Sequence, residues 1–320
     1  MMDVEYKPED PIHFGGCALG AFMDKKFPKP DYLWDNFIAR GDFVMVTGDT
    51  GIGKTLVTTM LTLNLSQKRS FGALDPQYHR RTFYVDAEMS EADFQERISR
   101  VKEPITRTSD FYYLNLLGEE KEMDITNPEH QDALLETLET MSIEVLVLDN
   151  LFSLSSIKHF NKPEEFIEGL KPLIFKLRRK KITTFLVDHL NKEGKPYGNT
   201  AKLVFLDYIL KLTKDEEGVY EFEVIKQRRM GVNKKDLTFT INEDNKVEYV
   251  DREDLVSPEQ FKRWMENNYS RYYPIPSKSK AKAIETMYEV YEKRFNHKPF
   301  VSALSFEKNY AKEWNNNAGV

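Results

Sequence analysis

The chain has 320 residues, of which 40% are hydrophobic and 31% charged, and its formal net charge is −6. This is the balance of a soluble globular protein, and the net charge argues against a protein coated in nucleic acid. The apolar runs stop far short of a membrane span, the first residues lack a signal-peptide pattern, and the single Cys17 cannot form an intramolecular disulfide. We therefore expect a cytoplasmic protein with no membrane partner.

The charge is unevenly distributed along the chain. From Ser257 onward there are eleven Lys/Arg against seven Asp/Glu, so the preceding residues carry a net charge of −10. An acidic body repels nucleic acid in general, while a local basic surface attracts it. The distribution permits local contact with nucleic acid without requiring it.

Residues up to about Pro30 are rich in Pro, Gly and charge, which predicts an arm. From Phe43 to Asp188, short apolar runs alternate with amphipathic stretches of helical length. The expected strands are Phe43–Thr47, Thr82–Asp86, Phe111–Leu114, Val145–Leu148 and Ile182–Val187. The expected helices are Lys54–Ser66, Ser90–Val101, Pro128–Met141 and Pro163–Lys181. This alternation predicts an α/β fold with a mostly parallel sheet covered on both faces.

After Asp188 the pattern changes. Runs at Asp207–Thr213, Gly218–Gln227 and Asp236–Asn242 lie close together, which predicts antiparallel strands that extend one edge of the sheet. Beyond them we expect a helix that opens near Ser257-Pro258, a Tyr/Pro-rich linker at 269–276, and a helix at Ser279–Phe295. The predicted organisation is an N-terminal arm (1–29), a large α/β domain (30–256) and a small helical C-terminal extension (257–320).

The loop after the first expected strand carries the pattern GxxxxGK[ST]. It consists of Gly48, Asp49, Thr50, Gly51, Ile52, Gly53, Lys54 and Thr55. The glycines let backbone N–H groups wrap a phosphate, Lys54 brings a positive charge to the outer phosphates, and the Thr55 hydroxyl can bind magnesium. The positive dipole end of the following helix faces the same anion. This P-loop predicts binding of ATP with Mg²⁺.

Three other strands are expected to end in polar residues at the same edge, where ligands of such sheets bind. The fourth strand is followed by Asp149, whose carboxylate can hold the water shell of magnesium. Close to the end of the second strand, Glu88 either polarises the attacking water or serves as a first-turn acid beside the helix cap Ser90. After the fifth strand, His189 either reports the state of the γ-phosphate or is simply a satisfied polar residue.

Together these residues resemble the core of the RecA-type ATPases, most closely the RepA-like and DnaB-like hexameric helicases. The resemblance rests on the P-loop, the Asp-x-Glu at 86–88, the Leu-Val-Leu-Asp at 146–149, the Asp-His at 188–189, and shorter similarities at 30–42 and 198–212. It covers roughly residues 30–242. It implies a RecA-like fold, ATP hydrolysis with Mg²⁺, and an active form that is a ring or filament, with a hexamer as the expected form.

The resemblance also implies roles for Lys226 and Arg228. In hexameric members of this superfamily, a Lys-x-Arg pair on a late strand reaches the ATP site of the neighbouring subunit. There a guanidinium neutralises the charge that develops on the γ-phosphate. Lys226-Gln-Arg228 matches this pattern, and Arg229 is a substitute for Arg228. The alternative is an idle, solvated basic turn at the end of a strand.

The chain departs from these relatives at both ends. No region resembles the primase-binding domain of DnaB-type helicases, and residues 257–320 match no known pattern. The segment at 191–199 lies where relatives contact DNA, and it contains Lys192, Lys195 and Tyr197. The C-terminal extension mixes aromatic and basic residues, which suits stacking on bases. However, one set of its apolar residues falls at the helical spacing of a buried stripe: Ile284, Met287, Tyr288 and Tyr291.

Two functions therefore follow from the sequence. The first is an ATP-hydrolysing, oligomeric, RecA-type motor that acts on single-stranded DNA in replication or recombination, as helicases do. The alternative is an ATP-switched regulatory or loader ATPase that recruits a protein partner through the C-terminal extension without translocating. A small-molecule kinase fits less well, because it would need a lid and an acceptor pocket and would have no use for the Lys-x-Arg pair.

Overall fold

A computed structural model describes residues 16–34, 36–118, 122–157, 162–189, 204–215, 218–229, 237–250, 261, 265 and 280–295. The chain forms two compact units, 1–31 and 32–320. In the described part of the first unit, a short helix α1 (Leu19–Met23) precedes Phe27, whose ring lies 5.5 Å from that of Phe22. This helix was not predicted, because five residues carry too little periodic signal. The domain boundaries expected at 29/30 and 256/257 stay predictions.

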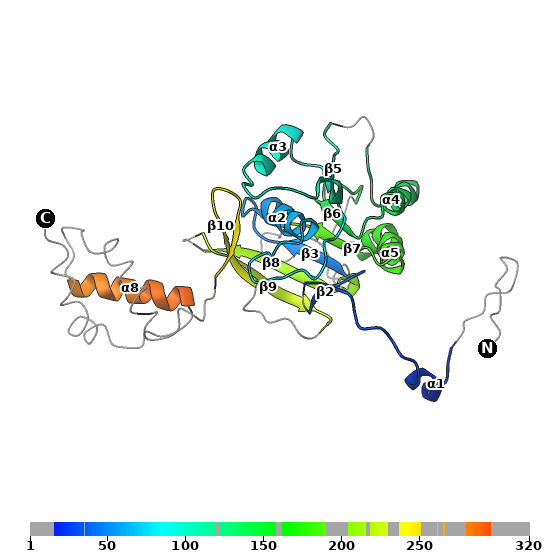
Figure 1. Ribbon diagram of the computed structural model, residues 1–320, viewed down its shortest axis with the longest axis horizontal. Coiled ribbons are helices and arrows are strands. Elements are labelled where there is room, and N and C mark those ends of the chain that lie inside the picture. The colour runs from blue at the N-terminus through cyan, green and yellow to red at the C-terminus, as the bar shows by residue number, and fades with distance from the viewer. Residues whose placement is uncertain are drawn as a thin grey trace, which may run out of the picture. The chain divides into compact units, whose positions relative to one another are not determined.

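Among the described residues, the second unit contains a sheet of nine strands in the order β11-β10-β9-β8-β3-β7-β6-β4-β5 (Figure 1). Its parallel strands are β3 (Phe43–Thr47), β4 (Thr82–Asp86), β5 (Phe111–Asn115), β6 (Val145–Asp149), β7 (Thr183–Val187) and β8 (Tyr208–Lys214). The first five confirm the predicted strands to within one residue, because continuous apolar runs suit strands that are buried on both faces. Strand β7 lies between β3, which leads into the P-loop, and β6, which ends in Asp149.

The antiparallel extension consists of β9 (Tyr220–Gln227), β10 (Thr238–Ile241) and β11 (Val247–Tyr249). The prediction needs one correction, since β8 is parallel to β3 and antiparallel only to β9. The connection from β7 to β8 spans residues 188–207, which is long enough for the crossover that a parallel pair requires. Sequence reasoning missed β11 and the small hairpin of β1 (Tyr32–Trp34) and β2 (Phe37–Ala39), because three residues give little pattern.

Helices cover both faces of the sheet (Figure 1). Helices α2 (Lys54–Ser66) and α3 (Glu91–Ser99) pack on one face, and α4 (Pro128–Thr140) and α5 (Pro163–Arg179) pack on the other. Alternate residues of a strand enter the two cores, so that Val46 faces the core that contains Val57 of α2, while Met45 faces the core that contains Leu173 of α5. The predicted three-layer α/β fold is confirmed.

The helix boundaries follow from local chemistry. Ser90 caps α3 by accepting a hydrogen bond from the backbone N–H of Asp93 at 3.1 Å, and Asn127 caps α4 in the same way. Helix α5 ends at Arg179, two residues earlier than predicted, and Lys181 then adopts a left-handed conformation with φ of 54°. A left-handed residue cannot continue a right-handed helix, so the chain turns there into β7.

In the C-terminal extension the structure describes Phe261, Met265 and helix α8 (Lys280–Phe295), which confirms the helix expected at 279–295. Ile284, Met287 and Tyr291 are buried, and the ring centroid of Tyr291 lies 4.8 Å from that of Phe261. This stripe is therefore used for packing and is closed to base stacking. Of the helix expected to open near residue 257, the structure describes only Phe261 and Met265, both of them helical. The linker at 269–276 and the loop at 191–199 lie outside the described residues. Within the described part of the chain, no helix has the length and apolar character to cross a membrane.

Candidate nucleotide site

The carboxyl ends of β3, β4, β6 and β7 meet at one edge of the sheet, and four of the predicted site elements lie there. Strand β3 runs into the P-loop, and α2 begins at Lys54 inside that loop. The register of the sheet places Asp86 directly beside Asp149. Asp188 follows β7, and its backbone N–H donates to the carbonyl of Val46 in β3 at 2.9 Å. Topology alone thus gathers the P-loop and three carboxylates at one edge.

The P-loop is closed around the side chain of Lys54. Its Nζ donates to the carbonyls of Gly48 and Asp49, each at 3.0 Å, and the residue is only 6% exposed. Burial lowers the pKa of Lys54, and nearby carboxylates, Asp149 first, oppose that shift. Gly48 allows the loop to pass close to β8, because a Cβ at this position would lie 2.7 Å from the carbonyl oxygen of Leu212. The loop is a preformed ring of backbone groups with one cation at its centre.

Asp149 has the surroundings expected of a residue that holds a cation. One carboxylate oxygen, Oδ2, accepts a hydrogen bond of 2.6 Å from the hydroxyl of Tyr84. The other, Oδ1, is buried and has no hydrogen-bond partner among the described residues. Burial raises the pKa of Asp149 to about 6, although the Tyr84 hydrogen bond acts in the opposite direction. The Thr55 hydroxyl also lowers the pKa of Asp149, so it lies near this carboxylate, although it makes no hydrogen bond to Oδ1. A buried carboxylate oxygen in this position fits a magnesium ion or a water of its shell.

Glu88 lies in the loop after β4 and points toward His189. The two side chains approach to 3.9 Å between Oε1 and Nε2, and Oε1 is also 3.5 Å from the hydroxyl of Ser153. The loop is held by Asp86, whose Oδ1 accepts the backbone N–H of Glu88 at 2.8 Å. The side chain of Glu88 is 46% exposed, so it is accessible to a bound substrate and to water.

The alternative interpretation of Glu88 as a first-turn acid of α3 is wrong. The helix begins at Glu91, after its cap Ser90, and Glu91 and Asp93 fill its first turn. His189 belongs to the same cluster, because its Nε2 lies 3.1 Å from Asn150 Nδ2 as well as 3.9 Å from Glu88 Oε1, and both roles expected for it stay predictions.

Sequence reasoning missed Tyr84, which is fully buried and holds Asp149. Burial raises the pKa of Tyr84 well above its usual value, so the residue remains a hydrogen-bond donor at every physiological pH. One signal was present in the sequence: a tyrosine inside a strand that is buried on both faces needs a partner for its hydroxyl. The pairing with Asp149 becomes visible only when β4 and β6 are placed side by side.

The Lys226–Arg228 segment lies at the amino ends of the parallel strands, whereas the P-loop lies at their carboxyl ends. Gln227 pairs with Tyr208 at the start of β8, whereas the strand end that leads into the P-loop, Thr47, pairs with Lys211. The backbone N–H of Arg228 donates to the carbonyl of Asp207, and its guanidinium lies 3.7 Å from the Asp207 carboxylate. Three residues of a strand span about 10 Å. The structure therefore does not bring these residues to the P-loop of the same subunit.

Arg229 is bound to a buried acid of the same subunit, and its expected role as a substitute for Arg228 stays a prediction. Its Nε and Nη2 lie 3.2 and 3.1 Å from Asp42 Oδ1, and Nε is also 3.2 Å from Oδ2. Asp42 is 3% exposed and precedes β3. Burial raises the pKa of Asp42, and the hydrogen bonds from Arg229 oppose this shift. The pair fixes the end of the basic segment to the beginning of the central strand.

We expect Arg229→Gln to destabilise the protein by about 1–3 kcal/mol, because the substitution leaves the buried Asp42 carboxylate without its cation. The loss would appear as a lower urea midpoint in the absence of nucleotide. The double variant Asp42→Asn/Arg229→Gln should recover part of the loss, since no buried charge remains. Equal stability of Arg229→Gln and the unmodified protein would show that the pair contributes nothing.

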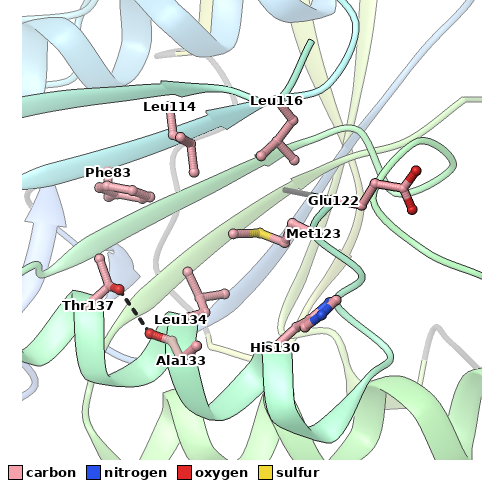
Figure 2. A pocket seen from close by; sticks show the side chains of 9 residues that line it. All are labelled: Phe83, Leu114, Leu116, Glu122, Met123, His130, Ala133, Leu134 and Thr137. Atoms are coloured by element: carbon pink, nitrogen blue, oxygen red, sulfur yellow. Dashed lines mark hydrogen bonds between the residues drawn. The ribbon is translucent and has the colours of Figure 1, made fainter. Parts of the chain in front are cut away.

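Two cavities are found near the candidate nucleotide site. One, of about 560 Å³, is lined by Thr55 and Glu88, by Arg97 of α3 and by Arg100, the residue after that helix. The other, of about 660 Å³, is an apolar space between β4, β5 and α4 (Figure 2). Its lining residues are Phe83, Leu114, Leu116, Glu122, Met123, His130, Ala133, Leu134 and Thr137, none of which was predicted to contact nucleotide.

A parallel sheet with a P-loop at the end of one strand, and with an acidic strand end two strands away, has the arrangement of a P-loop ATPase. The chain belongs to the AAA domain family, whose sequence profile matches residues 9–195. Among solved structures, a KaiC-like protein from the hyperthermophilic archaeon Pyrococcus horikoshii is similar, with a TM-score of 0.49 and 15% sequence identity over 66% of this chain and 90% of that chain. No curated protein matches the chain.

Proposed function

We propose that this ATPase is an oligomeric motor that acts on single-stranded DNA. The observation that carries the proposal is that the basic pair and the nucleotide-binding loop lie at opposite ends of the strands of the sheet. Lys226 and Arg228 lie at the amino end of β8, and the P-loop lies at the carboxyl end of β3. Lys226 and Arg228 can therefore serve only the site of another subunit. The choice of single-stranded DNA rests on the resemblance to hexameric helicases.

In this proposal the P-loop, residues 48–55, wraps the phosphates of ATP, and Thr55 and Asp149 hold the magnesium ion. The ion supplies positive charge that neutralises the phosphate oxygens. Lys54 exchanges its hydrogen bonds to the loop carbonyls for the outer phosphates. Tyr84 keeps Asp149 oriented by holding Oδ2, which leaves Oδ1 directed at the metal shell.

Glu88 then orients the water that attacks the γ-phosphate and accepts its proton. His189 and Asn150 hold Glu88 in place and respond to the phosphate, because His189 contacts both residues. Arg228 of a neighbouring subunit neutralises the charge that develops on the γ-phosphate, and Lys226 assists it. Each round of hydrolysis thereby changes the contact between two subunits, which is how a ring or filament can move along a strand.

The test is the ATPase rate with and without single-stranded DNA, for the unmodified protein, Arg228→Ala and the control Arg179→Ala. The control removes an arginine from the last turn of α5 and is expected to retain activity. Arg228→Ala should lose the DNA-stimulated rate about a thousandfold. Mixing Arg228→Ala with Glu88→Ala should restore part of it, because at mixed interfaces one subunit supplies the arginine and the other supplies the glutamate.

A rate that is indifferent to single-stranded DNA would reject the motor and direct attention to a protein partner. A rate that is stimulated by DNA but unaffected by Arg228→Ala would retain the motor and reject the arginine in trans. Absence of rescue in the mixture, with both variants shown to be folded and assembled, would reject the shared site.

A further inference from the structure

Strand β8 continues past the end of its neighbour β3 and runs alongside the P-loop. Thr47, the last residue of β3, pairs with Lys211, and β8 extends beyond this pair to Lys214. The P-loop follows Thr47 directly, and Gly48 packs closely against the backbone of Leu212. The carboxyl end of β8 therefore lies beside the loop that is proposed to bind phosphate.

The side chain of Lys214 lies on the same face of the sheet as α2, the helix that begins inside the P-loop. Leu210 and Leu212 share the core of that face with Val57 of α2, and residues two apart on a strand point to the same face. Lys211 points to the opposite face, where its Nζ lies 3.7 Å from a carboxylate oxygen of Glu223. The last cation of β8 is thus on the side of the sheet where the loop turns into α2.

Tyr220 lies between Lys214 and the P-loop, because it is the cross-strand partner of Lys214 in β9. Its hydroxyl lies 3.3 Å from the position that a Cβ on Gly53 would occupy. The same hydroxyl accepts a hydrogen bond of 3.0 Å from Nζ of Lys214. The ammonium also lies 4.6 Å from the centroid of the tyrosine ring, which is within the range of a cation–π interaction. One hydroxyl therefore separates this ammonium from the backbone of the P-loop.

The support under Lys214 is rigid, while its charge is accessible. Tyr220 is only 5% exposed, and its ring stacks on that of Phe239 with a centroid distance of 5.6 Å and an interplanar angle of 11°. Lys214 itself is exposed, and within the described part of the chain no carboxylate pairs with its ammonium. A cation that is held in place beside a phosphate loop, without a carboxylate partner, is prepared for a bound anion.

We propose that Lys214 is a second phosphate-binding cation of the nucleotide site and that Tyr220 positions it. Lys54 is buried and contacts the phosphates from within the loop, whereas Lys214 contacts them from the exposed side. An ammonium has three donors, so Lys214 can keep its hydrogen bond to Tyr220 while it donates a second one to a phosphate oxygen. The inference rests on the proposed binding of ATP by the P-loop. It is independent of DNA and of assembly.

The experiment measures the dissociation constants of magnesium ADP and of a non-hydrolysable ATP analogue by calorimetry. Lys214→Met removes the charge and keeps an apolar stem, and Lys214→Arg keeps the charge. Tyr220→Phe removes the hydroxyl and keeps the ring that stacks on Phe239. The matched control is Lys211→Met, which removes a cation from the opposite face of the same strand.

We expect Lys214→Met to weaken the binding of both nucleotides about tenfold at low salt, and Lys214→Arg and the control to weaken it less than about threefold. Because the charge is exposed, the loss should shrink when the salt concentration is raised from about 0.05 M to about 0.5 M. Tyr220→Phe should weaken binding about threefold, but it should add nothing to the loss in Lys214→Met, since it acts through the lysine. A purely structural role of Tyr220 would give the same loss in both backgrounds.

Equal dissociation constants for Lys214→Met and the unmodified protein would overturn the proposal. So would an equal loss in Lys211→Met, or a loss in Lys214→Met that neither responds to salt nor is restored by Lys214→Arg. A threefold loss for Tyr220→Phe in both backgrounds would overturn the positioning role. If the unmodified protein binds neither nucleotide, the proposed ATP site itself fails, so the two failures are distinguishable.

Discussion

Replacing Glu88 by Gln should lower the turnover number for ATP hydrolysis by a factor of about 100 or more while ATP still binds. Gln has nearly the same shape and can keep the contacts with His189 and Ser153, but it cannot accept a proton from the attacking water. The loss should therefore appear in kcat, with KM and the dissociation constant for a non-hydrolysable analogue within a few-fold of the unmodified protein.

The matched control for this prediction is Glu91→Gln. This substitution removes a nearby carboxylate from the first turn of α3, whereas Glu88 lies in the loop before that helix. It should retain activity apart from a small loss of helix stability. If Glu88→Gln hydrolyses ATP at the normal rate, the water is oriented by another group, and Asp86 becomes the next residue to test.

Replacing Asp149 by Asn should abolish magnesium-dependent hydrolysis and at the same time stabilise the nucleotide-free protein at neutral pH. The pKa of Asp149 is about 6 in the folded protein, above the usual 3.8, because burial disfavours the charged form. The folded state thus binds this proton more tightly than the unfolded state. The stabilising effect of the proton is complete below about pH 4 and is lost as the pH rises to about 6. A difference of about two units corresponds to roughly 3 kcal/mol.

Above about pH 6 the unmodified protein carries that full penalty, whereas the amide of the Asp149→Asn variant would remain neutral and still accept the Tyr84 hydrogen bond. Urea unfolding without nucleotide or magnesium, at about pH 5 and at about pH 8, should show a larger advantage for Asp149→Asn at the higher pH. The exposed control Asp132→Asn should show no such trend, since its side chain is 69% exposed. A variant that is less stable at both pH values would show that the charge of Asp149 contributes to folding.

The strands and helices of the ATPase core could be predicted from the sequence because each one satisfies its local pattern. Phe43–Thr47 and Val145–Asp149 are apolar nearly throughout and buried on both faces, and α4 begins where Asn127 and Pro128 specify a start. The direction of β8 could not be predicted, since its residues would suit a strand of either direction. Only the long connection from β7 makes a parallel pair possible.

The candidate site was predictable where chemistry follows a strand directly. The P-loop, Glu88, Asp149 and His189 all come within a few residues of a strand end, and parallel strands bring their ends to one edge. Contacts across the sheet were not predictable. Tyr84 reaches Asp149 from a neighbouring strand, and Arg229 contacts Asp42, which precedes it by 187 residues in the sequence. These pairs depend on strand order, which single residues do not encode.

The tie between Arg229 and Asp42 has a mechanical consequence for an assembly of subunits. Strand β3 begins immediately after Asp42 and ends at the P-loop. Its five residues therefore connect the P-loop to Asp42, which holds Arg229, the residue after Arg228. A displacement of this strand caused by the phosphates would be passed along its length with little attenuation, because packed strands hardly compress. In the proposed ring, we expect each subunit to transmit its own nucleotide state to the next through this strand, so that the order of hydrolysis around the ring is fixed and not random.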